Sequence, residues 1–115
     1  MVDNVVMTFT HEEFLRNKEN RIKKSIYHGE SAFTQTFDFL HKYYTLKDLS
    51  GDTPILCVFE AIYIQNLNMP SWKLAIKCNL SRTTLFNYRN QIVKDFYLCI
   101  EENLIDYEVA TTKED

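Results

Sequence analysis

The stretch between positions 71 and 89 constrains the fold more than any other part of this 115-residue chain. It holds two short apolar segments separated by Asn79 and Leu80. Two helices that cross closely need a small residue at the contact, and Ala75 lies in the middle of the first segment. The turn needs a residue that tolerates a positive φ, for which Asn is the usual substitute for Gly, and then an apolar residue such as Leu80 between the helices. The pattern predicts a helix-turn-helix.

The second helix of this pair is predicted to begin at Ser81 and to continue to about Leu104. Ser is a good N-cap residue, because its hydroxyl accepts a hydrogen bond from a backbone amide of the first turn. Leu85, Tyr88 and Ile92 follow at spacings of three and four, which predicts a shared buried face. At about 1.5 Å per residue this helix is about 35 Å long, which is more than a helix-turn-helix can cover.

The first helix of the chain is predicted to begin at Thr10. Thr10 and Glu13 have the spacing of a capping box, in which each side chain bonds the other residue's backbone amide. The helix is expected to end near Gly29, which can adopt the left-handed conformation of a C-cap. The only segment whose pattern allows a short extended piece of chain lies over positions 5–9.

The remaining predicted helices run over about 31–46, from Thr53 to about 66, and from Pro70 to the turn. Thr53 is expected to be an N-cap with Pro54 at the first helical position. The chain is therefore predicted to be all-α, with about five helices, a C-terminal helix-turn-helix and a long last helix. A single domain is expected, divided into a helical pair at 1–50, a helix-turn-helix region at 53–104 and an acidic tail at 105–115.

Charge is segregated along the chain, whose net charge is −3. Basic residues occupy the stretch between positions 71 and 94, with no acid among them: Lys73, Lys77, Arg82, Arg89 and Lys94. Acids dominate from position 101 onward: Glu101, Glu102, Asp106, Glu108, Glu114 and Asp115. The basic block coincides with the helix-turn-helix and indicates an anionic partner there.

Double-stranded DNA is the expected partner, because the first residues of a recognition helix face base edges in the major groove. The candidate base-contacting residues are Arg82, Thr83, Thr84, Phe86 and Asn87. Thr and Asn can hydrogen-bond bases, and Arg can read guanine. The candidate phosphate-contacting residues are Ser71, Lys73, Lys77, Ser81, Arg89 and Lys94. For Phe86, packing against Trp72 is an equal alternative to a DNA contact.

The segment from Leu74 to Leu85 begins with Leu-Ala and ends with Asn-Leu-Ser-Arg-Thr-Thr-Leu, in which Asn79 and Leu80 form the turn. This pattern resembles the tetrahelical helix-turn-helix of bacterial regulators, in which Gly is commoner at the position of Asn79. Its place behind a helix that starts at Thr53 resembles sigma-factor region four and the small phage late regulators of the ArpU and RinA types. The resemblance covers about 53–101 and implies a DNA-binding regulator of transcription.

A homodimer is also expected, because symmetric regulators read paired half-sites. Beyond Arg89 the last helix carries two apolar stripes: Ile92, Phe96 and Cys99 on one, and Val93, Tyr97, Ile100 and Leu104 on the other. One stripe is expected to pack on the motif and the other on the N-terminal helices or on a second subunit. Packing within the chain, on the Phe-rich second helix, is the alternative.

Other functions have less support in the sequence. A protein-interaction module that keeps the scaffold and binds RNA polymerase or a replication factor is the main alternative. No catalytic or metal-ligating constellation includes His11, His28 or His41, so no enzyme, cofactor or metal is expected. No apolar run reaches the length of a membrane span. The three separated cysteines, Cys57, Cys78 and Cys99, predict reduced, buried thiols in a cytoplasmic protein.

Overall fold

The structure, a computed structural model, describes the backbone of residues 2–51, 54–66 and 69–114 and the side chains of 11–51, 54–66 and 69–101. Within these ranges it is helical without a strand, which confirms the predicted all-α class. The elements are α1 (Val2–Tyr27), α2 (Ser31–Leu49), α3 (Ile55–Phe59), the π-helical turn η1 (Glu60–Ile64), α4 (Ser71–Lys77) and α5 (Arg82–Glu114).

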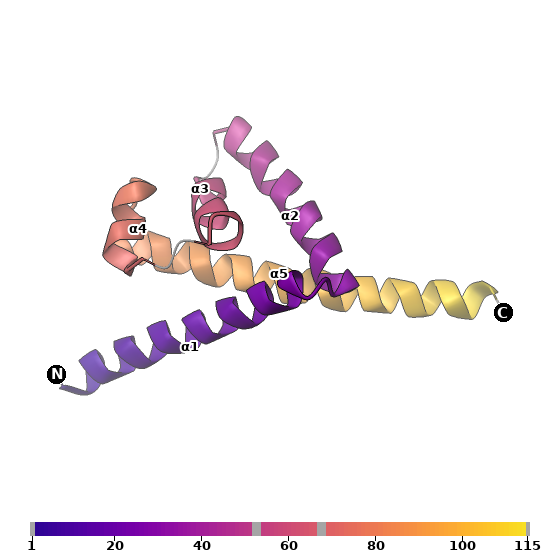
Figure 1. The fold of residues 1–115 in the computed structure, drawn as a ribbon, viewed down its shortest axis with the longest axis horizontal. Helices are drawn as coiled ribbons and strands as arrows, with labels where there is room; N and C mark the ends of the chain where they lie inside the picture. Colours follow the sequence, from indigo (N-terminus) through magenta and orange to yellow (C-terminus); the bar gives the residue numbers. More distant parts are fainter. Residues whose placement is uncertain (1, 52–53, 67–68, 115) are drawn as a thin grey trace.

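Helix α5 is the element on which the others assemble (Figure 1). Helices α1, α2, α3 and α4 each contact it. The C-terminal end of α1 reaches the middle of α5, and α2 then leads away from that point. Helices α3 and α4 lie over the first half of α5. The first half of α5 therefore packs against α3 and α4.

The core is centred on Phe59 of α3, which is completely buried. Its ring centroid lies 5.3 Å from that of Tyr44, 5.4 Å from that of Phe37 and 6.3 Å from that of Phe96. Burying a side chain of this size stabilises a fold by about 1.5–3 kcal/mol. This aromatic cluster joins α2 and α3 to the middle of α5.

Five of the seven members of the two apolar stripes of α5 pack within the chain. Ile92, Val93, Phe96, Tyr97 and Cys99 are buried or half-buried against the core. Ile100 is half-buried. Because α2 packs along α5, this is the intramolecular arrangement that the sequence left as an alternative. Leu104 lies outside the described side chains, and the homodimer stays a prediction.

The predicted beginning of the first helix is wrong. Helix α1 begins at Val2, so Thr10 lies inside it and does not cap it. Positions 5–9 are helical, not extended. No Gly or Pro precedes Thr10, so nothing in the sequence interrupts the helix at the capping-box pattern. The side chain of Thr10 lies outside the described residues.

The predicted end of α1 is confirmed. Gly29 has φ +72°, and the amides of Gly29 and Glu30 donate to the carbonyls of Ile26 (3.0 Å) and Ser25 (3.1 Å). These two bonds are those of a Schellman motif. The next helix, α2, ends at Leu49, three residues beyond the predicted end.

The third predicted helix is divided into two parts. Helix α3 begins at Ile55, and Pro54 is its N-cap residue and not its first helical residue as predicted. Thr53, the predicted N-cap, lies outside the described residues. The chain then widens into the π turn η1, closed by a bond from the Gln65 amide to the Glu60 carbonyl at 2.8 Å. Asn66, with φ +51°, follows where the sequence predicted the helix to end.

Candidate nucleic-acid interface

The predicted turn between α4 and α5 has the expected backbone geometry. Asn79 adopts φ +56°. Its amide donates to the carbonyl of Ile76 at 3.1 Å, and the amide of Leu80 donates to that of Ala75 at 2.8 Å. These bonds form a second Schellman motif, with Asn79 in the left-handed position that Gly usually takes. Ala75 is buried, as the close crossing of the two helices requires.

Ser81 caps α5 as predicted. Its hydroxyl oxygen accepts a hydrogen bond from the amide of Thr84 at 3.1 Å, and its hydroxyl donates to the Thr84 side chain at 2.8 Å. Leu85 and Ile92 are buried and Tyr88 is half-buried, so the predicted inner face of the helix is confirmed. The side-chain hydroxyls of Ser81 and Thr84 are thereby bonded to each other at the start of α5.

Arg89 does not lie on the surface, and the prediction that it contacts phosphate is wrong. It is 2% exposed. Its Nη2 donates to Glu19 Oε1 at 2.7 Å and its Nε to Glu19 Oε2 at 3.0 Å, which is a bidentate ion pair with α1. An arginine on the inner face of a helix stays charged when buried carboxylates compensate it.

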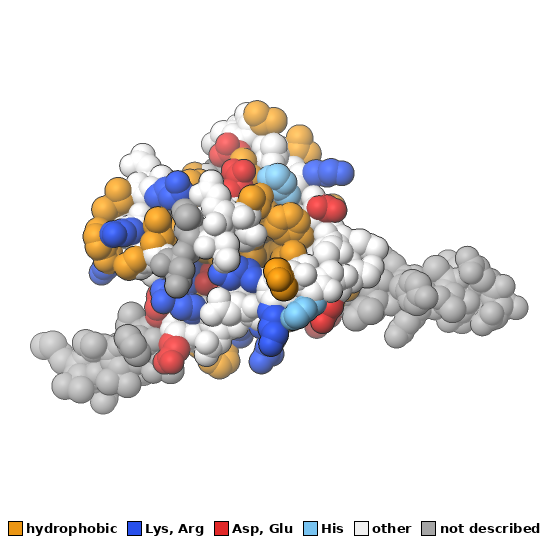
Figure 2. Space-filling model, in the orientation of Figure 1, with side chains coloured by type: hydrophobic (Ala, Val, Ile, Leu, Met, Phe, Trp, Pro, Cys, Tyr) orange, Lys and Arg blue, Asp and Glu red, His pale blue; other side chains and the backbone are white. Residues whose placement is uncertain are grey.

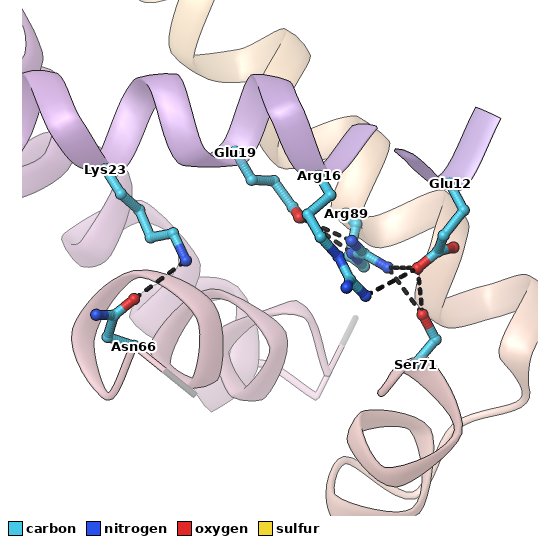
Figure 3. Close-up of polar contacts among 7 residues, drawn as sticks. All are labelled: Glu12, Arg16, Glu19, Lys23, Asn66, Ser71 and Arg89. Atoms are coloured by element: carbon cyan, nitrogen blue, oxygen red, sulfur yellow. Dashed lines mark hydrogen bonds and ion pairs between the residues drawn. The ribbon is translucent and has the colours of Figure 1, made fainter. Parts of the chain in front are cut away.

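A second carboxylate completes this polar cluster (Figure 3). Arg89 Nη1 lies 2.8 Å from Glu12 Oε1 and 3.1 Å from Ser71 Oγ, and the Ser71 hydroxyl donates to Glu12. Arg16 Nη2 is 3.6 Å from the same Glu12 oxygen. The side chain of Ser71, a predicted phosphate contact, is therefore engaged within the protein. The cluster ties α1 to the start of α4 and to α5.

The cluster changes the acidity of its members. Burial alone would raise the pKa of Glu12, but hydrogen bonds from Ser71 and Arg89 and the charges of Arg89 and Arg16 lower it below its ordinary value. Burial alone would lower the pKa of Arg89, but its bonds and ion pairs with Glu19 and Glu12 raise it. Both charges of the Glu12–Arg89 pair are thus present at neutral pH.

The remaining predicted contact residues differ in exposure. Arg82, Thr83 and Asn87 are exposed along the outer face of α5, and Thr84 is half-buried. Phe86 is half-buried and packs against the core, so packing accounts for part of its side chain. The predicted phosphate contacts that remain exposed are Lys73, Lys77, Ser81 and Lys94. Figure 2 shows basic side chains over α4 on the face that it presents.

Two polar residues on the outer face of α5 were not among the predicted contacts. Asn90 is half-buried and Gln91 is exposed, and they follow Asn87 by three and four residues. Residues at these spacings share one face of a helix. Helical spacing from Asn87 is the signal that could have found them. The carboxylates that pair with buried Arg89 are those of Glu12 and Glu19, which lie 77 and 70 positions away on α1. The sequence around Arg89 contains no signal that predicts these partners.

Among the described residues, no three His, Cys, Asp or Glu side chains are grouped as metal ligands. No helix in the described part of the chain is long and apolar enough to cross a membrane.

Cys78 is buried, whereas Cys57 and Cys99 are half-buried. Burial and the neighbouring thiol of Cys57 raise the pKa of Cys78 to about 12.

Comparison of the chain with protein-family models, with curated protein sequences and with solved structures finds no match. The resemblance of the helix-turn-helix to bacterial and phage regulators therefore stays a prediction from the sequence pattern.

Proposed function

We propose that this chain is a DNA-binding regulator of transcription that places the first turns of α5 in the major groove. The observation that carries the proposal is the joint between α4 and α5. Ala75 allows a close crossing, Asn79 makes the left-handed turn and Ser81 caps a helix whose outer face begins with exposed Arg82 and Thr83. In helix-turn-helix proteins the second helix lies in the major groove, and its N-terminal residues contact the base edges.

The charge distribution supports the same proposal. With Arg89 compensated by carboxylates, four basic side chains between positions 71 and 94 remain exposed: Lys73, Lys77, Arg82 and Lys94. The sequence holds no acid between Ser71 and Lys94. If all four cations neutralise phosphates, the slope of log K against log salt is about −3 to −4 for duplex DNA.

Salt dependence of binding to a random-sequence duplex tests the proposal. We expect the joint substitution Lys73→Ala and Lys77→Ala to reduce the slope by about 2, because two released counterions are lost. Lys42→Ala, which removes an exposed lysine of α2, is the matched control and leaves the slope unchanged. Absence of binding at low salt contradicts the proposal, as does an equal effect of the control.

A second candidate function is a protein-interaction module that keeps the helix-turn-helix scaffold. The observation that favours it is an apolar stripe on α2, formed by Phe39, Tyr43 and Leu46, which are 57%, 41% and 67% exposed. The Phe39 and Tyr43 rings are stacked with centroids 6.2 Å apart. Exposed apolar residues that gather in one place are typical of contact surfaces.

Substitutions in this α2 stripe separate the two candidates. Phe39→Ser with Leu46→Ser removes apolar surface without touching α4 or α5. The interaction candidate predicts that this variant loses self-association or binding to RNA polymerase, measured by sedimentation and by pull-down with purified polymerase. The DNA-binding proposal predicts that it keeps salt-dependent duplex binding. This test also decides whether homodimerisation and a contact with RNA polymerase belong to the function of the chain.

A further inference from the structure

The outer face of α5 continues beyond the residues that the sequence pattern indicated. Asn87, Gln91 and Lys94 are exposed and Asn90 is half-buried, at spacings of three, four and seven from Asn87. Arg89, on the opposite side of the same turns, is buried. Side chains at these spacings line one side of a helix, and long recognition helices present their groove-facing residues in this way.

The Gln91 side chain is held by a hydrogen bond within the protein. Its Nε2 donates to Asp95 Oδ1 at 2.8 Å, and Asp95 Oδ2 accepts a hydrogen bond from the Tyr44 hydroxyl at 2.6 Å. Tyr44 comes from α2 and is 1% exposed. Burial and the bond to Asp95 raise the pKa of Tyr44, so this hydroxyl remains a donor at neutral pH. Hydrogen bonds from Tyr44 to Asp95 and from Gln91 to Asp95 therefore connect the core to the exposed Gln91 amide.

This arrangement suits one base. A side-chain amide has two N–H donors and one acceptor oxygen, so one bond to Asp95 leaves one donor and the oxygen of Gln91 for a ligand. Adenine presents an N6 donor and an N7 acceptor in the major groove, which a Gln amide matches with two bonds. Because Asp95 and Tyr44 already restrict the Gln91 side chain, less conformational entropy is lost when it binds.

The acidic neighbour does not prevent this role. Asp95 is half-buried, and its two oxygens accept bonds from Gln91 and Tyr44. Lys94 is the preceding residue and is exposed, so the same turn of α5 also carries a cation on the surface that would face DNA.

We propose that Gln91 is a specificity-determining residue that selects adenine in the major groove, and that Asp95 and Tyr44 are the residues that position it. This inference rests on the proposed function, because it assumes that α5 enters the groove. It extends the reading surface by one helical turn beyond Asn87.

Selection of bound sites from a random duplex library tests the inference. We expect the wild-type chain to enrich sites with adenine at a fixed position. Gln91→Ala is expected to reduce the preference for adenine at that position by about 5- to 150-fold while leaving the rest of the motif. Gln91→Lys is expected to shift the preference toward guanine. Gln35→Ala, which removes an exposed glutamine of α2, is the matched control and keeps the wild-type motif.

Tyr44→Phe tests the positioning role, because it keeps the ring in the core and removes only the hydroxyl. We expect it to weaken the adenine preference while affinity for random duplex stays unchanged. An adenine preference that persists in Gln91→Ala, or a wild-type motif without a fixed adenine, overturns the inference and leaves the proposed function standing. Failure of the wild-type chain to bind any duplex overturns both.

Discussion

Arg89 of α5 and Glu19 of α1 form a bidentate ion pair between residues 70 positions apart, with N···O distances of 2.7 and 3.0 Å. Both side chains are almost completely buried, at 3% and 5% exposure. The pair fixes α1 across the inner face of the helix that we propose reads DNA. Arg89 belongs to the basic block of the sequence, but it orients α5 and is not part of the exposed surface of that helix.

Breaking this pair is expected to destabilise the fold. Arg89→Met leaves the Glu19 carboxylate buried without its partner, so we expect the free energy of unfolding to fall by about 3–5 kcal/mol. The double variant Arg89→Met with Glu19→Leu removes both charges of this pair and leaves Glu12 with Arg16 and Ser71, so it is expected to recover part of that loss. Urea denaturation at neutral pH measures all three proteins. A double variant no more stable than Arg89→Met contradicts a buried, mutually compensating pair.

Acid is expected to weaken the cluster through Glu12. The lowered pKa of Glu12 means that its stabilising contribution is complete above the ordinary value of 4.5 and is lost as the pH falls through the lower, folded-state value. Glu12→Gln should therefore make the free energy of unfolding less dependent on pH below about 5. Glu13→Gln changes an exposed carboxylate on the same helix and is the control. Identical pH profiles for the two variants would show that Glu12 is not stabilised by its partners.

The turn residue Asn79 is expected to tolerate glycine and reject a β-branched side chain. At φ +56° a residue with a Cβ branch costs about 1–2 kcal/mol, so Asn79→Val should lower the free energy of unfolding by that amount. Asn79→Gly should stay within about 0.5 kcal/mol of the wild type, since Gly adopts this conformation readily but loses more entropy on folding. Asn17→Val, in an exposed helical position of α1, is the control and should change little.

The parts of the fold that the sequence predicted correctly depend on neighbours a few residues away. Hydrogen bonds that reach only a few residues along the chain determine three of these features: the left-handed conformation of Asn79, the cap at Ser81 and the helix end at Gly29. Local signals failed where a longer context decided the outcome. The capping-box pattern at Thr10 does not begin a helix, because the chain before it also forms one.

Tertiary contacts account for the rest of the differences. Whether a basic residue of α5 is exposed depends on what packs against it, and the partners of Arg89 lie on α1. The same holds for Gln91, whose position depends on Tyr44 of α2. The apolar stripes of α5 were correctly recognised as packing surfaces, but periodicity alone could not distinguish α2 from a second subunit.

Amide chemical shifts recorded during titration with a short DNA duplex show directly whether α5 binds DNA. We expect the largest changes at Arg82, Thr83 and Asn87, smaller changes at Lys73 and Lys77 of α4, and none along the α2 stripe of Phe39, Tyr43 and Leu46. Shifts confined to that stripe, or no shifts at low salt, would contradict the claim that α5 binds DNA.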